Sequence, residues 1–401
     1  MSDRALTGLA ARLDERIPTP EAFDSGLRGP RTTSRVGVWL GVAFAICFVT
    51  GLYSHAAQLA APPVPLPTSP ARLYQLTQGL HVAAGTAAVP LLLVKLWSVF
   101  PRFFIRPPRA RRELVVHLLE RLSIALLVGG AIFQLATGLA NSAQWYPWSF
   151  GFVGAHYAVA WITAGALVLH IGVKLPVIRA ALTGPVDDPM PEGLGAETDR
   201  EAGDGPSRRT LLHATWVSAL LAVVAATSNE VPGLRRLGVL AVRSGEGPQG
   251  VPVNRSAVAA GVADLLDDPD WRLTITGPAG ARELSLDDLR ALPQREAVLP
   301  IACVEGWSAT GTWSGIPIRE LVALVGGSSQ SAVVVRSMQG RGAWRESRVP
   351  ANVVQDADSL LALTLSGEPL DPDHGFPCRL IAPARPGVLQ TKWVHEMEVQ
   401  A

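Results

Sequence analysis

The chain has 401 residues, which is enough for two or three domains. Apolar residues make up 48% of it and the mean hydropathy is +0.25, so the composition excludes a wholly water-soluble protein and places part of the chain in lipid. The formal net charge of +1 gives no support for a nucleic-acid partner.

Apolar segments of membrane-spanning length occupy the first half of the chain. They are Val36–Leu59, Leu80–Phe100, Leu122–Ala143, Phe152–Val173 and Leu211–Ser228. Each is at or near the roughly 20 residues that a helix needs to cross a ~30 Å hydrocarbon core. A signal peptide would be single, N-terminal and shorter. The sequence therefore predicts an integral protein of the lipid bilayer, with a four-helix bundle and a fifth anchoring helix.

The basic residues of the connecting segments predict the orientation. The N-terminal tail before Val36 carries six arginines, and the second connection carries Arg102, Arg106, Arg109, Arg111 and Arg112. By contrast, the first connection has only Arg72, and Asn141–Gly151 has no Lys or Arg. Basic loops stay in the cytoplasm. We therefore expect a multi-pass cell-membrane protein whose N-terminus is cytoplasmic and whose chain after about Glu230 is extracytoplasmic, in the periplasm or outside the cell.

Two signals precede the fifth apolar segment. Ala181–Pro206 is rich in Gly, Pro, Asp and Glu, which is typical of a flexible linker. Ser207–Leu212 reads Ser-Arg-Arg-Thr-Leu-Leu and resembles a twin-arginine export signal, which implies the twin-arginine export machinery as a partner. The alternative is that the two arginines only flank a helix on its cytoplasmic side.

Histidines within the first four apolar helices predict haem. Five of the eight histidines lie there: His55, His81, His117, His156 and His170. His156 and His170 are separated by about 3.9 helical turns, or ~21 Å of rise, so they lie on one helix face near opposite membrane surfaces. Two b-type haems stacked in a four-helix bundle need axial imidazoles at such depths.

Matching the depths of these histidines predicts the pairs. We expect His81 with His156 at the outer haem and His117 with His170 at the inner haem. His55 is a further candidate, as an alternative outer ligand or a propionate partner. The alternative for any one of them is a hydrogen-bonded packing residue or a proton relay.

This region resembles the four-helix diheme cytochrome b subunits of respiratory hydrogenases and formate dehydrogenases, which implies two haem b groups and quinone or quinol as a partner. Those subunits commonly take a ligand near the cytoplasmic start of the first helix. This chain has no histidine there.

From about Asn254 the pattern changes to short strands and helices, which indicates an α+β domain with a mixed sheet. Trp271–Thr276 alternates as a strand, and Val333–Arg336 and Cys378–Ile381 are further candidate strands. Ser285–Asp288 is a capping box, and Pro317 and Gly326 delimit a short helix.

Four blocks in this domain carry a more specific resemblance. They are Cys303–Ser308 (Cys-Val-Glu-Gly-Trp-Ser), Trp313–Ile318, His374–Arg379 and Gly387–Trp393. In this order they resemble the sulfite-oxidase-type molybdopterin domain over about Asn254–Ala401. The resemblance implies that Cys303 gives a thiolate ligand to molybdenum. It also implies that Asn254, Arg255, His374, Arg379 and Lys392 hold the molybdopterin and its phosphate.

Within that family the chain combines features of two branches. Val-Glu-Gly-Trp after Cys303 is similar to the bacterial periplasmic methionine-sulfoxide reductases, whereas His374 is a choice similar to sulfite oxidases. Leu389 stands where relatives carry a second lysine, and Arg385 is a candidate to supply the missing charge.

Two features of the domain have open alternatives. Trp307, Trp313, Trp344 and Trp393 are candidates for a substrate cleft, although tryptophans are more often core. A Cys303–Cys378 disulfide is the alternative to a metal thiolate if the domain lies outside the cell.

The sequence divides into six segments: 1–35, an N-terminal tail; 36–178, a cytochrome b domain; 179–206, a linker; 207–229, a twin-arginine-like helix; 230–253, an external linker; and 254–401, a molybdopterin-binding oxidoreductase domain.

The predicted function is electron passage between the quinone pool and an external small-molecule or protein-bound oxo-transfer substrate, with reduction of an S-oxide or N-oxide favoured. Oxidation of a substrate such as sulfite, or a transmembrane electron carrier with a non-catalytic docking domain, are the alternatives.

Overall fold

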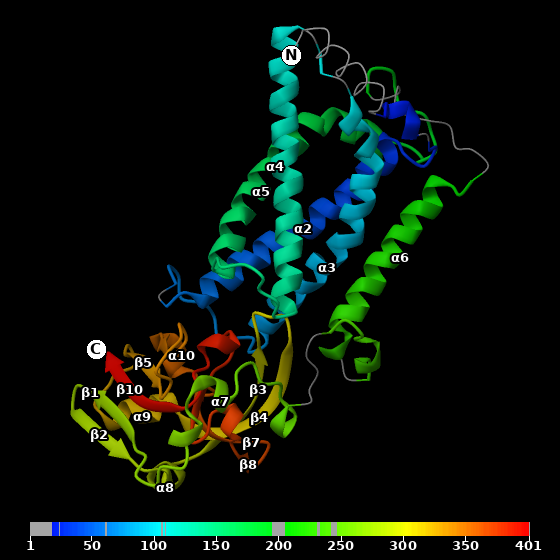
Figure 1. Cartoon of the computed structure of the whole chain (residues 1–401). Coiled ribbons are helices and arrows are strands. Elements are labelled where there is room, and N and C mark those ends of the chain that lie inside the picture. Colours follow the sequence, from blue (N-terminus) through cyan, green and yellow to red (C-terminus); the bar gives the residue numbers. More distant parts are fainter. Residues whose placement is uncertain are drawn as a thin grey trace, which may run out of the picture. The chain divides into compact units, whose positions relative to one another are not determined.

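A computed structural model of the chain describes residues 18–23, 25–60, 62–105, 107–108, 110–194, 205–230, 233–241 and 247–400 (Figure 1). The chain divides into two compact units. Unit 1 comprises Met1–Phe48, Ala84–Asn141 and Tyr146–Val224, and unit 2 comprises Val49–Ala83, Ser142–Trp145 and Ala225–Ala401. Unit 2 therefore contains the last third of the first long helix, the start of the next one and the whole C-terminal domain.

Long apolar helices account for the first half of the chain. They are α2 (Pro30–Gln58), α3 (Leu73–Val99), α4 (Arg111–Ser142), α5 (Phe152–Leu182) and α6 (Arg208–Thr227). Among the described residues, these five helices are long and apolar enough to cross a membrane. Many of their large apolar side chains are exposed, as expected of helices that face lipid. The five predicted apolar segments are confirmed as helices.

The helices extend beyond the apolar segments where polar residues find partners. In unit 1, Arg31 Nη2 donates to Pro189 O (3.1 Å), and Arg35 donates to Ala181 O (2.9 Å) and Gly184 O (2.7 Å). These guanidinium groups satisfy carbonyls at the C-terminal end of α5, where the helix dipole favours positive charge. The predicted linker thus begins as a bound segment, while its residues 195–204 lie outside the described ones.

Arg208 of the twin-arginine-like motif is buried at 3% exposure. Its Nε donates to Gly26 O (2.8 Å), and its Nη1 donates to Val186 O (3.4 Å). Arg209 instead forms an exposed ion pair with Asp187 at 3.1 Å. Arg208 therefore has packing partners in the folded protein, and a role for the motif in export stays a prediction.

The C-terminal domain holds two five-stranded sheets. The first has the order β2-β1-β10-β5-β6: β2 (Gly280–Leu284), β1 (Leu273–Gly277), β10 (Val394–Gln400), β5 (Ala332–Ser337) and β6 (Glu346–Val349). The second has the order β3-β4-β7-β8 with β9 also on β7: β3 (Arg295–Ala302), β4 (Ser308–Pro317), β7 (Leu360–Leu365), β8 (Glu368–Pro369) and β9 (Arg379–Ile381). Because β1 pairs with β10 in parallel and its other partner β2 is antiparallel, the predicted mixed sheet is confirmed.

Short helices connect these strands: α7 (Ala257–Ala260), α8 (Leu286–Ala291), α9 (Ile318–Leu324) and α10 (Ala351–Gln355). The predicted capping box opens α8, where the Ser285 side chain accepts from the Asp288 amide and the Asp288 carboxylate accepts from the Ser285 amide. A buried apolar core, including Leu273, Ile316 and Leu321, joins β1, β4 and α9. These elements form a rigid frame for the loops that carry the site.

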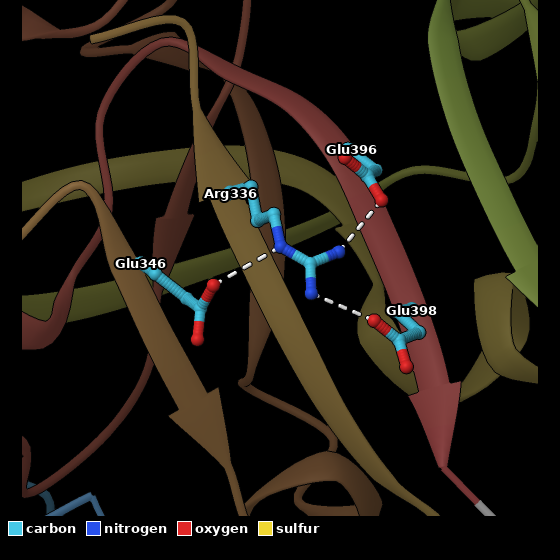
Figure 2. A network of polar contacts seen from close by, with 4 residues as sticks. All are labelled: Arg336, Glu346, Glu396 and Glu398. Carbon is cyan, nitrogen blue, oxygen red and sulfur yellow. Dashed lines mark hydrogen bonds and ion pairs between the residues drawn. The ribbon is translucent and has the colours of Figure 1, made fainter. Parts of the chain in front are cut away.

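One ion network fixes the register of the first sheet (Figure 2). Arg336 on β5 lies opposite Glu346 of β6 and Glu396 of β10. Its guanidinium contacts Glu346 at 3.0 Å, Glu396 at 2.6 Å and Glu398 at 2.7 Å. The hydrogen bond that Arg336 donates to Glu398, together with the other two carboxylates, raises the pKa of Arg336. The network stabilises cross-strand pairing on an accessible face of the sheet.

Candidate active site

One cavity in unit 2 brings together the residues that the resemblance implies for molybdopterin. Its lining includes all six of them: Asn254, Arg255, Cys303, His374, Arg379 and Lys392. The space between these walls is about 750 Å³, including the open mouth. Residues far apart in the sequence thus meet at one place, as the sequence analysis predicts for a single site.

Cys303 follows the end of β3 and begins a tight turn. Its amide donates to Trp307 O (2.8 Å), and the Gly306 amide donates back to Cys303 O (3.1 Å). Gly306 has a φ of +92°, a conformation that glycine adopts at little cost. The Cys303 side chain is buried with 2% exposure, yet it borders the cavity. The turn therefore presents one thiol to the interior of the site.

The alternative disulfide is not formed: neither Cys303 nor Cys378 is bonded to another cysteine. They belong to different apolar clusters: Cys303 packs with Trp307, whereas Cys378 packs in the core with Met397. The Cys378 thiol donates to Val394 O (3.4 Å), and burial raises its pKa. Cys378 is thus a core residue, and the cavity contains a single cysteine among its lining residues.

Arg379 is the most deeply buried cation of the cavity, with 4% exposure. It donates to His374 O (3.0 Å) and Gln390 O (3.2 Å) and lies 5.1 Å from the centroid of the Trp313 ring. Its buried Nε has no hydrogen-bond partner among the described residues. Burial lowers the pKa of Arg379 to about 9. An anion in the cavity would relieve this cost of burying a positive charge.

Lys392 and His374 flank Arg379. Lys392 Nζ donates to Arg255 O (2.5 Å) and Asp373 O (2.9 Å), and burial, together with the charge of Arg379, lowers the pKa of Lys392 to about 7. His374 Nε2 lies 2.7 Å from Pro248 O, to which it must donate, and burial lowers its pKa. A neutral His374 then has an acceptor at Nδ1.

The cavity also includes residues that sequence reasoning missed or left open. Gln390, next to Leu389, lines it, and the buried Oε1 of Gln390 has no hydrogen-bond partner in the described chain. Arg385 lies outside the lining and donates to Arg348 O (3.0 Å), so it does not replace the missing lysine. Of the four tryptophans considered, three line the cavity: Trp307, Trp344 and Trp393. Trp313 lies wholly in the core.

These residues fit an anionic pterin cofactor that carries molybdenum. Arg255, Arg379 and Lys392 are suited to a phosphate, and Gln390 Oε1 is an unused acceptor for ring N–H groups. Among the described residues there is no cluster of three or more His, Cys, Asp or Glu side chains that could hold a metal by themselves.

The candidate haem histidines lie in both units. His55 and His81 are in unit 2, and His117, His156 and His170 are in unit 1. The pairing of His81 with His156 joins the two units and stays a prediction, and so does the pairing of His117 with His170.

His156 has the hydrogen bonding expected of an iron ligand. The Thr137 hydroxyl donates to Phe133 O (2.6 Å), so it accepts from His156 Nδ1 at 3.0 Å. This bond puts the lone pair of the neutral ring on Nε2, the nitrogen that would bind iron. A Cβ at Gly138 would lie 3.8 Å from the ring, so this glycine keeps one side of it accessible.

His81 has similar neighbours, with Thr50 Oγ1 at 3.1 Å from Nδ1 and the backbone of Gly51 beside the ring. His117 differs, because Arg121 Nε donates to its Nε2 at 3.4 Å. The residues around His81 and His156 therefore fit haem ligation better than those around His117.

The family described as the oxidoreductase molybdopterin binding domain matches residues 259–401. The chain is 31% identical over 135 residues to a protein of Azospira oryzae named as a protein-methionine-sulfoxide reductase subunit, YedZ1. The aligned residues make up 33% of this chain and 50% of that protein. It is 27% identical over 163 residues to mitochondrial sulfite oxidase of Rattus norvegicus, with coverages of 33% and 30%.

The chain is also 29% identical over 134 residues to the uncharacterized oxidoreductase YuiH of Bacillus subtilis, with coverages of 33% and 66%. It thus spans between 30% and 66% of the length of these relatives. Residues 259–401 therefore form an oxidoreductase molybdopterin-binding domain, homologous to sulfite oxidase and to methionine-sulfoxide reductase subunits, behind a region of five apolar helices.

Proposed function

We propose that this chain is a membrane-bound molybdoenzyme that passes electrons between the quinone pool and an oxo-transfer substrate outside the membrane. The observation that carries the proposal is the cavity that gathers Cys303 with Arg379 and Lys392. An anion would stabilise these buried cations, and the buried thiol lies beside them. This arrangement is suited to an anionic molybdenum cofactor and has no evident role in a domain that binds no cofactor.

Each residue has a defined task in this proposal. Cys303, as a thiolate, binds molybdenum. The phosphate of the cofactor is bound by Arg255, Arg379 and Lys392. The pterin ring donates a hydrogen bond to His374 Nδ1. When bound, the cofactor supplies oxygen-atom transfer chemistry, and the protein provides binding, orientation and charge.

The membrane helices supply the electrons. His81 with His156, and His117 with His170, bind two b-type haems, and His55 is the spare candidate at the outer site. The N-terminus is cytoplasmic, the C-terminal domain is exported through the twin-arginine machinery, and quinol is the donor. Quinol oxidation releases two electrons and two protons, and reduction of an S-oxide to a sulfide consumes two electrons and two protons and releases water. The overall reaction is therefore balanced without another reactant.

The favoured substrates are S-oxides and N-oxides, because the Cys-Val-Glu-Gly-Trp block is similar to methionine-sulfoxide reductases. A relative named as such a reductase subunit supports this direction. Sulfite oxidation with quinone reduction is the runner-up, favoured by His374 and by the likeness to sulfite oxidase.

The direct experiment follows haem absorbance in purified protein under anaerobic conditions. Haem reduced with a quinol analogue should be reoxidised by methionine sulfoxide, dimethyl sulfoxide or trimethylamine N-oxide, and the Cys303→Ser variant should not respond. Reduction of oxidised haem by sulfite would establish the runner-up direction. Failure of all of these in molybdenum-loaded protein would refute the proposed function.

A further inference from the structure

The turn that carries Cys303 is bound to the N-terminal end of α3 within unit 2. Gln78 Nε2 donates to Val304 O (3.3 Å), and Gln75 Nε2 donates to Ser308 Oγ (2.8 Å). All of these residues belong to unit 2, which contains Val49–Ala83 as well as the C-terminal domain. Both ends of the turn are thus hydrogen-bonded to one helix.

Apolar packing accompanies these bonds. Ala302, directly before Cys303, is buried in one cluster with Ala57 of α2 and Tyr74 of α3. A Cβ at Gly306 would lie 2.8 Å from Val82 Cγ2, so only glycine lets the turn approach the helix this closely. The contact is therefore a packed one, with a glycine at its closest point.

Gln78 is held on both sides. Its Oε1 accepts from Ser54 Oγ (3.2 Å) of α2, and its Nε2 donates to Val304 O. Gln78 is 8% exposed, so its amide is shielded from competing water. Residues of α2 and α3 together therefore fix the orientation of this amide. The amide in turn fixes the position of the Val304 carbonyl.

Gln78 also lies next to a candidate haem ligand. His81 is three residues further along α3, which places the two side chains on neighbouring turns of one helix face. The backbone of Val304, the residue after Cys303, is therefore connected to the His81 turn by one hydrogen bond and one helical turn.

We propose that Gln78 is a positioning residue, which holds the Cys303 turn against the His81 turn of α3 and so sets the point at which electrons enter the molybdenum site. This inference rests on the proposed function. Two one-electron transfers through this contact, with two protons, would be needed for each S-oxide converted to sulfide and water. Gln75 supports the same contact at the other end of the turn.

The test uses Gln78→Glu in the full-length protein. The glutamate keeps the acceptor for Ser54 but cannot donate to Val304 O when ionised. Losing a hydrogen bond worth about 1 kcal/mol changes an equilibrium about fivefold, so reoxidation of pre-reduced haem by methionine sulfoxide should slow by about fivefold or more. Reduction of methionine sulfoxide by a small viologen donor, which can reach the cavity directly, should stay within twofold of wild type.

A matched control is Gln58→Glu. Gln58 donates to Ser54 of the same helix, so this change introduces the same charge into the network around Gln78 but leaves the bond from Gln78 to Val304 O in place. Haem reoxidation in this variant should equal that of wild type. Gln75→Ala and Ser308→Ala remove the two halves of the second bond, so the double variant should be no slower than either single variant.

A second readout needs no bound cofactor. Hydrogen exchange at the amides of Cys303 and Gly306, which close the turn, should be faster in Gln78→Glu than in wild type or in Gln58→Glu. Unchanged exchange, or unchanged haem reoxidation despite faster exchange, would overturn the inference. Absence of any turnover with viologen in wild type would instead refute the proposed function and leave the exchange result to decide whether the contact exists.

Discussion

Lys392 offers a quantitative prediction about the empty cavity. Its pKa is lowered from 10.5 to about 7, because it is buried and lies near Arg379. The unfolded chain keeps this proton up to about pH 10, so between pH 7 and 10 the unfolded state binds more protons than the folded one. The stability of the cofactor-free domain should therefore rise with pH across this window and lose that gain as the pH falls through 7.

The size of the effect follows from the shift. Each pH unit inside the window contributes about 1.4 kcal/mol, so raising the pH from 7 to 9 should stabilise the cofactor-free domain by roughly 2 kcal/mol. An anionic phosphate beside Lys392 keeps the ammonium charged, so bound cofactor should raise its pKa and abolish the pH dependence. Lys392→Met should abolish it as well, and should also weaken cofactor retention.

The composition of the chain makes Lys392 directly observable, because there are only three lysines: Lys95, Lys174 and Lys392. Protein labelled with ¹⁵N-lysine gives three side-chain signals, and Lys392→Arg assigns the third. The Nζ signal of Lys392 should titrate near pH 7 without cofactor and well above it with cofactor. A titration at pH 10 or above in the cofactor-free protein would refute the reasoning.

Three further changes test other parts of the structure. Thr137→Val removes the acceptor of His156 Nδ1 and should lower haem affinity by about 10-fold or more at that site, measured by haem titration; unchanged affinity would argue against a ligand role for His156. Gly315→Ala places a Cβ 2.1 Å from Leu361 O in the paired strand and should destabilise the domain by roughly 3 kcal/mol or more in denaturant unfolding, whereas a loss below 1 kcal/mol would show that the strands can separate. Arg336→Ala leaves three neighbouring carboxylates without their cation and should cost about 1 kcal/mol in low salt but less in 1 M salt; a loss independent of salt would contradict the ion network.

Hydropathy located the membrane helices but not their ends. Helix α3 begins at Leu73, seven residues before the predicted Leu80, because its first turns carry Gln75 and Gln78, which bind the Cys303 turn. Helix α5 continues to Leu182, where Arg31 and Arg35 satisfy its last carbonyls. Such polar partners are distant in sequence, so a window average does not detect them.

The site was predictable where chemistry depends on a rare residue in a fixed block. Cys303, His374 and Lys392 are of this kind, and the structure places them around one cavity. Gln390 was missed, because a glutamine carries no charge or metal-binding signature and gains meaning only from its burial. The order of the strands was also not predicted, since it depends on pairing between segments such as β1 and β10 at opposite ends of the domain.

The haem assignments show the limit of depth matching. Depth in the membrane predicted His81, His117 and His156 as ligands, with His117 the least supported of them. The structure gives His81 and His156 a hydroxyl at Nδ1 and gives His117 an arginine at Nε2. The position of a histidine along a helix predicts its depth in the membrane. It does not predict which side chain will lie beside the imidazole ring.

The central claim is that Cys303 binds molybdenum in a chain that also holds haem. The most direct measurement is metal and haem analysis of the purified protein, with X-ray absorption at the molybdenum edge, for wild type and Cys303→Ala. We predict about one molybdenum and two haems per chain, with one sulfur ligand fewer, or no molybdenum, in the variant and unchanged haem. Wild-type protein with haem but without molybdenum, or an identical sulfur coordination in the variant, would contradict the account.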